Sequence, residues 1–121
     1  MGLDFKVAER NGFTSVTVEG DPSLNEFLSF VEALGEQSRG WASACALCDL
    51  RGVRTLKSYA EHYAIGQAVG RHMAHLRRVA SVVPPDRITH TSEKTARSAG
   101  VDLMVFTSEG TAIEWLCSSS E

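Results

Sequence analysis

The chain has few cysteines, few prolines and few aromatic residues. Three cysteines and three prolines occur in 121 residues, and Phe, Trp and Tyr together make up 7%. An odd cysteine count does not suit a disulfide framework, and the opening "MGLDFKVAER" does not resemble a signal peptide, so we expect a cytoplasmic protein. No apolar run approaches the length of about 18 residues that a membrane span needs.

An excess of charge of either sign is also missing. The 12 basic and 15 acidic residues give a formal net charge of -3, so no global field attracts nucleic acid or an anionic membrane. What remains is a globular composition, with 43% hydrophobic and 22% charged residues. The length suits one compact domain, and we expect residues 1–121 to form a single domain.

The chain opens with a predicted β-hairpin followed by an amphipathic helix. Two alternating runs, at about 3–9 and 13–19, flank Asn11-Gly12, a dipeptide suited to a tight turn. Asp21 is the expected helix cap, with Pro22 at the first helical position. The helix then has one apolar face, formed by Leu24, Phe27, Leu28, Val31 and Leu34.

Three more apolar runs alternate with predicted helices. "WASACALCDL" precedes a helix from about Ser58 to Arg78, "RRVASVV" stops at Pro84-Pro85, and "VDLMVF" precedes a short terminal helix. The polar segment "DRITHTSEKTARSAG" is predicted as helical because a parallel crossover needs one. The fold class is therefore α/β in the order β-β-α-β-α-β-α-β-α, with a mostly parallel sheet and an antiparallel edge strand.

The cysteine pair in "CALC" is the first candidate for chemistry. Side chains three positions apart on a strand point to opposite faces, so Cys45 and Cys48 cannot share a metal or a disulfide. We expect both, and Cys117, to be packing residues. The sequence predicts no metal site and no cofactor.

The histidines of the second helix are the next candidates. His62 falls within an apolar arc and is expected to be a core or rim residue with a hydrogen-bonded ring. The arc is formed by Tyr59, Tyr63, Gly66, Val69, Gly70 and Met73. His72 and His75 have a spacing that could reach one metal. Arginines 71, 77 and 78 favour a solvated basic end that complements the helix dipole instead. Gly66 and Gly70 are expected to let this helix approach the sheet.

Ser58 has two compatible interpretations. With Glu61 three positions later it matches a capping box, in which the serine accepts from the helix backbone and the glutamate reaches back to the cap. A helix N-terminus also accommodates a phosphate on or near that serine. Asp49, Asp86 and Ser108 are expected just past parallel strands, at the edge where open α/β sheets bind ligands. No nucleophile–base–acid set or phosphate loop predicts an enzyme.

Several segments resemble a STAS domain, the fold of bacterial anti-sigma-factor antagonists and of the cytoplasmic tails of sulphate transporters. They are the β-β-α opening, "ALCDLRGVRTLKS", "RRVASVV" and "GVDLMVFTSEGTAIEWL". The last is similar to small stand-alone bacterial STAS-like proteins. The resemblance covers nearly the whole chain and implies a βα superhelical fold, which CRAL-TRIO lipid-transfer domains share.

The resemblance also implies a position for a phosphorylation switch. In the antagonists a strand ends in aspartate, and a loop then leads to Asp-Ser-[Ser/Thr]-Gly, whose serine or threonine an anti-sigma kinase phosphorylates. Asp49 matches the strand end and Ser58 the phosphorylated position. Lys57, Tyr59 and Ala60 depart from the motif, so we do not expect the standard switch.

Two functions follow as hypotheses. The first is a non-catalytic STAS-like module that binds a protein partner, with a homodimer also compatible with the sequence. Its expected binding edge comprises Asp49, Arg54, Lys57, Ser58, Tyr59, Glu61, Asp86 and Ser108. The alternative is a carrier for a small apolar ligand or lipid, with a pocket lined by Tyr59, Tyr63 and Met73.

Overall fold

The computed structural model describes residues 2–56, 58–85 and 91–118. Lys57 and Asp86 of the expected binding edge lie outside these ranges. The elements follow the predicted order: β1 (Leu3–Glu9), β2 (Thr14–Gly20), α1 (Leu24–Ser38), β3 (Cys45–Val53), α2 (Tyr59–His72), β4 (Arg78–Val82), α3 (Thr91–Ser98), β5 (Leu103–Phe106) and α4 (Glu109–Cys117). Among the described helices, none is long and apolar enough to cross a membrane.

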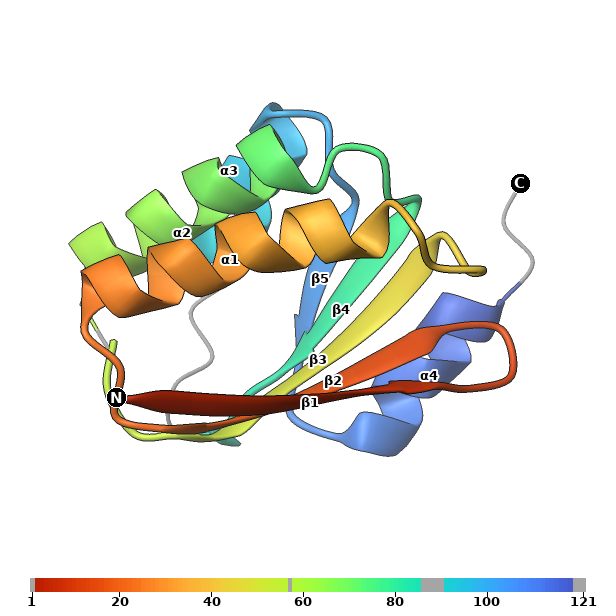
Figure 1. The fold of residues 1–121 in the computed structure, drawn as a ribbon, viewed down its shortest axis with the longest axis horizontal. Coiled ribbons are helices and arrows are strands. Elements are labelled where there is room, and N and C mark those ends of the chain that lie inside the picture. Colours follow the sequence, from red (N-terminus) through yellow and green to blue (C-terminus); the bar gives the residue numbers. More distant parts are fainter. Residues whose placement is uncertain (1, 57, 86–90, 119–121) are drawn as a thin grey trace.

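The strands form one five-stranded sheet in the order β1-β2-β3-β4-β5. Strand β1 is antiparallel to β2, while the other neighbouring pairs are parallel. Helices α1, α2 and α3 cover one face of the sheet and α4 lies on the other (Figure 1). The predicted α/β class and the antiparallel edge strand are confirmed.

Each face of the sheet has its own apolar core, and the two buried cysteines lie on different faces. Cys48 belongs to the core beneath α1 and α2, whereas Cys45 packs with Ala112 and Leu116 of α4. The predicted opposite orientation is confirmed. Burial raises the pKa of the Cys48 thiol to about 12, so this thiol is inert. Cys117 is exposed, so its predicted packing role is wrong: it follows Leu116 and turns away from the buried face.

Helix α1 is capped by Ser23 rather than by Asp21. The Ser23 hydroxyl accepts from the Glu26 amide at 3.1 Å, and the Glu26 carboxylate accepts from the Ser23 amide at 2.8 Å. This reciprocal pair satisfies two backbone donors, which an aspartate two positions earlier cannot do. Asp21 instead forms an ion pair with Arg54.

Helix α2 ends at His72 and not near Arg78, because the chain must enter the parallel ladder of β4 at that residue. Arg78 lies opposite Cys45 in this ladder. Met73 already leaves the helical conformation, with φ −121° and ψ 20°. His75 therefore lies beyond the helix, where its Nε2 is 2.7 Å from the Ser38 hydroxyl.

Arg78 forms hydrogen bonds with the end of α4. It was predicted to belong to a basic end of α2 instead. Its buried guanidinium donates to the Trp115 carbonyl and to the Ser118 hydroxyl, and lies 5.0 Å from the Trp115 ring centroid. A cation beside the last carbonyls of a helix stabilises that end. Helix α4 is thereby held on its face of the sheet.

Gly70 lets α2 approach α3 rather than the sheet. A Cβ atom at this position would lie 2.3 Å from the Cβ of Ala99, just past α3. The predicted contact with the sheet is wrong for Gly70, because its open side faces this neighbouring chain segment. The close approach sets the shape of the surface between the two helices.

Candidate functional site

The residues of the expected binding edge are divided between different parts of the structure. Asp49 lies inside β3, four residues before its end, because β3 continues to pair with β2 through Gly52 and Val53. The expectation that Asp49 follows the strand is therefore wrong. Ser58 caps α2 and Ser108 caps α4, two helices that lie on opposite faces of the sheet (Figure 1).

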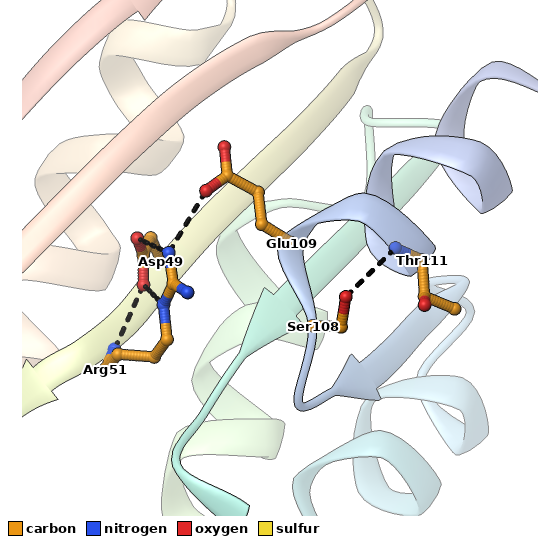
Figure 2. A network of polar contacts seen from close by, with 5 residues as sticks. All are labelled: Asp49, Arg51, Ser108, Glu109 and Thr111. Carbon is orange, nitrogen blue, oxygen red and sulfur yellow. Dashed lines mark hydrogen bonds and ion pairs between the residues drawn. The ribbon is translucent and has the colours of Figure 1, made fainter.

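Asp49 belongs to a polar network that joins β3 to α4 (Figure 2). Arg51 donates from Nε and Nη2 to the two Asp49 carboxylate oxygens at 2.9 and 2.7 Å, and from Nη2 to Glu109 Oε1 at 3.1 Å. The hydrogen bonds from Arg51 hold the pKa of Asp49 below its ordinary value. Residues two apart on a strand share a face, so the spacing of Asp49 and Arg51 was a signal from which their ion pair could have been predicted.

Ser108 and Arg54 are also engaged within the chain. The Ser108 hydroxyl accepts from the Thr111 amide at 3.4 Å at the start of α4 (Figure 2). Arg54 binds both carboxylate oxygens of Asp21, at 2.8 and 3.0 Å. The ion pair lowers the pKa of Asp21 and raises that of Arg54. It joins the segment after β2 to the segment after β3.

Ser58 forms the predicted capping box. Its hydroxyl accepts from the Glu61 amide at 3.2 Å and donates to Glu61 Oε1 at 2.9 Å, while the Ser58 amide donates to the same oxygen at 3.1 Å. This prediction is confirmed. Ser58, Tyr59 and Glu61 are thus brought together at the first turn of α2.

The loop before this cap is held by Leu56 and His62. Leu56 has φ 68° with its side chain buried, and the left-handed conformation costs a non-glycine residue about 1–2 kcal/mol. The His62 ring donates from Nε2 to the Leu56 carbonyl at 2.8 Å. His62 is half-buried, which confirms its predicted place at the rim. Nothing in the sequence indicates the left-handed Leu56.

The three residues of the expected apolar pocket do not meet in one pocket. Tyr59 and Tyr63 are exposed and stacked, with ring centroids 6.4 Å apart. They line a surface groove between α2 and α3, called here the α2–α3 groove, whose other lining residues are Gln67, Gly70, Arg71, Lys94, Thr95, Ser98 and Ala99. Met73 is buried on the sheet side of α2.

Met73 lines a small apolar cavity in the core. The cavity measures about 90 Å³ and lies between the sheet, α1 and α2. Its wall includes Phe27, Leu34, Cys48 and Val69, with His62 among the few polar residues. From the sequence, Arg71 was expected only at a solvated helix end, and nothing pointed to Lys94. No local pattern indicates that these two residues, 23 apart in the chain, share one surface.

Comparisons with known proteins define the class to which this fold belongs. The crystal structure of an anti-sigma factor antagonist from Mycobacterium paratuberculosis superimposes with a TM-score of 0.63 at 13% identity, covering 96% of this chain and 95% of the other. An uncharacterized protein of the DUF3478 family with a SpoIIAA-like fold, from Shewanella loihica, gives 0.53 at 17% identity, covering 96% and 94%. The fold is thus that of a STAS domain.

The family follows from the sequence match. The SpoIIAA-like family model matches residues 13–117, so the chain belongs to the SpoIIAA-like family. The comparison with curated proteins gives no match.

Proposed function

We propose that the chain is a non-catalytic, cytoplasmic interaction module whose protein partner docks on the α2–α3 groove. One observation carries this proposal: Tyr59 and Tyr63 are 72% and 45% exposed and stack on each other. Tyrosine is enriched among residues that dominate binding energy, because it offers a large, rigid surface with a polar tip. Two stacked tyrosines in water contribute little to the core, which supports a role in binding.

The charges of the groove favour an acidic partner segment. Arg71 of α2 and Lys94 of α3 line it, and no aspartate or glutamate occurs among its described lining residues. Complementary charge speeds association and excludes partners of the wrong sign. The structural neighbour named as an anti-sigma factor antagonist is consistent with a protein, rather than a metabolite, as the partner.

The contacts of Ser58 support a surface that binds without a phosphorylation switch. Its hydroxyl donates to the Glu61 carboxylate at 2.9 Å, so a phosphate there would lose that bond and meet a negative charge. Arg54, a basic residue four positions before Ser58, is already paired with Asp21. We therefore propose that Ser58 is unmodified in the cell and that binding is constitutive.

The size of the interior cavity favours an interaction module over a carrier. Pockets for small molecules usually measure about 300–1,000 Å³, whereas this cavity measures about 90 Å³. Tyr59 and Tyr63 line the α2–α3 groove instead of the cavity. A lipid chain would need the core to open, while a protein partner needs no such change.

The test begins with native mass spectrometry of the protein purified from its own host, which reports partner, ligand and stoichiometry together. Calorimetry with the purified partner then compares the parent with Tyr59→Ala/Tyr63→Ala. We expect this double variant to bind about tenfold or more weakly. The matched control, Glu36→Ala/Gln37→Ala on the exposed side of α1, is expected to bind within a few-fold of the parent.

Three results would contradict the proposal. A retained small molecule without a protein partner would favour the carrier. Equal binding by the tyrosine variant and the parent would place the interface elsewhere. Phosphopeptide mapping that finds substantial occupancy at Ser58, with loss of the partner on phosphorylation, would establish a switch. Ser58→Ala and Ser58→Glu are expected to bind within a few-fold of the parent.

A further inference from the structure

Strand β1 has an unpaired outer edge. It ends the strand order and pairs only with β2 among the described strands. All of its residues are at least partly exposed, and Phe5 is 40% exposed. Figure 1 shows β1 at one side of the sheet, next to β2. Exposed edges present backbone donors and acceptors to another chain, and native proteins manage them explicitly.

The hairpin fixes which backbone groups of β1 face outward. Arg10 donates its amide to the Phe13 carbonyl at 2.8 Å, so these two residues form a hydrogen-bonded antiparallel pair. Such pairs alternate along a strand, and the register continues from Glu9 opposite Thr14 down to Leu3 opposite Gly20. The amides and carbonyls of Leu3, Phe5 and Val7 are therefore directed away from β2.

The side-chain pattern of β1 is complementary to itself when two copies of the strand are related by a two-fold axis. Phe5 lies on the α1 side, with its ring centroid 4.9 Å from that of Phe30, and Leu3 and Val7 share that face by alternation. Asp4 and Lys6 lie on the other face. A second antiparallel β1 with Phe5 opposite Phe5 therefore sets Leu3 opposite Val7, and Asp4 opposite Lys6 twice.

We propose that two copies of this chain pair antiparallel through β1, with Phe5 on the two-fold axis, to form a continuous ten-stranded sheet. In this register the outward groups of Phe5 bond their symmetry mates, and Asp4 and Lys6 form close pairs without hydrogen bonds between their backbones. Shifting the register by two residues in either direction keeps the faces of the strand but sets Lys6 against Lys6, or Asp4 against Asp4. Like charges directly opposite are destabilising, so the sequence selects one register.

The charges near β1 within one copy of the chain also favour pairing with a second copy. Asp4 lies directly opposite Glu19 of β2, while Lys6 lies opposite Thr17. No described residue forms an ion pair with Asp4 or Lys6. In the proposed dimer each Asp4 gains the partner's Lys6, which offsets the repulsion from Glu19. The opposite signs at positions 4 and 6 thus favour pairing with a second copy rather than protection of a bare edge.

The dimer would leave both α2–α3 grooves open. Helix α3 packs on β5, at the other end of the sheet from β1 (Figure 1). A dimer through β1 would carry two such grooves and could hold a two-site partner with avidity. The interface itself does not depend on the function of the groove.

Sedimentation equilibrium of charge variants tests the interface directly. We expect the parent to be a reversible dimer, and Asp4→Lys or Lys6→Asp alone to raise the dissociation constant about tenfold or more, because each sets like charges opposite one another. An equal mixture of the two single variants should give heterodimers within a few-fold of the parent affinity, since their strands are complementary. The double variant Asp4→Lys/Lys6→Asp should self-associate again.

A parent that stays monomeric up to the highest accessible concentration would overturn the proposal, as would single variants that dimerise like the parent. Failure of the mixture to associate would also overturn it, because the register requires complementary rescue. Glu114→Lys on the exposed side of α4 controls for net charge and should leave the parent dimer unchanged. Circular dichroism of each variant verifies that it is folded.

Discussion

At the scale of single residues, Ser58 has an observed structural role that can be measured. We predict that Ser58→Ala lowers the free energy of unfolding by about 1 kcal/mol, the usual cost of losing a helix cap. Ser23→Ala is the matched control, because Ser23 and Glu26 form the same capping box on α1. Urea denaturation of the two variants should give similar losses.

A different outcome for the two serines would be informative. If Ser23→Ala loses stability and Ser58→Ala does not, the cap at α2 contributes nothing and the hydroxyl of Ser58 requires a functional explanation. The Arg51–Asp49–Glu109 network is a second case in which a polar side chain of the expected binding edge is held by contacts within the chain. Its carboxylate at Asp49 is held by three hydrogen bonds from Arg51, which explains why this aspartate is a structural residue in β3.

At the scale of elements, the spacing of α2 and α3 depends on Gly70. We predict that Gly70→Ala destabilises the fold by about 1–3 kcal/mol, because its Cβ would overlap Ala99 at 2.3 Å and force the helices apart. Gly110→Ala in α4 is the control: the nearest atom to its added Cβ is 3.8 Å away. That variant should be neutral, or more stable by about 0.5 kcal/mol from helix propensity.

Thermal and urea denaturation measure both glycine variants. A Gly70→Ala variant as stable as the parent would mean that α2 and α3 can separate freely. The lining of the α2–α3 groove would then be adjustable, and partner binding by that variant should be compared with the parent. Arg78 acts at the same scale, since it fixes α4 through the carbonyl of Trp115 and the hydroxyl of Ser118.

At the scale of the whole molecule, association through β1 links stability to concentration. We predict that the thermal midpoint of the parent rises with protein concentration, because binding between folded chains stabilises them by mass action. Asp4→Lys should show a smaller rise over the same concentrations, because its dimer dissociates more readily. Scanning fluorimetry over a hundredfold concentration range would measure this, and a constant parent midpoint would contradict the dimer.

The sequence by itself determined the elements and their order. Alternation around Asn11-Gly12 gave the hairpin, the Ser58 and Glu61 spacing gave the start of α2, and the side-chain period of a strand separated Cys45 from Cys48. These features depend on periodicities of two or about four residues. Local backbone geometry enforces such periodicities wherever the segment lies in the fold.

The tertiary structure alone decided which side chains meet. Asp21 was expected to cap α1, but it pairs with Arg54, which is 33 residues away in the chain. Arg78 was buried against the end of α4, and the apolar arc of α2 was divided between a core cavity at Met73 and an exposed groove at Tyr59. The reason is that a helical face is defined locally, whereas its covering depends on neighbours brought close by the sheet order.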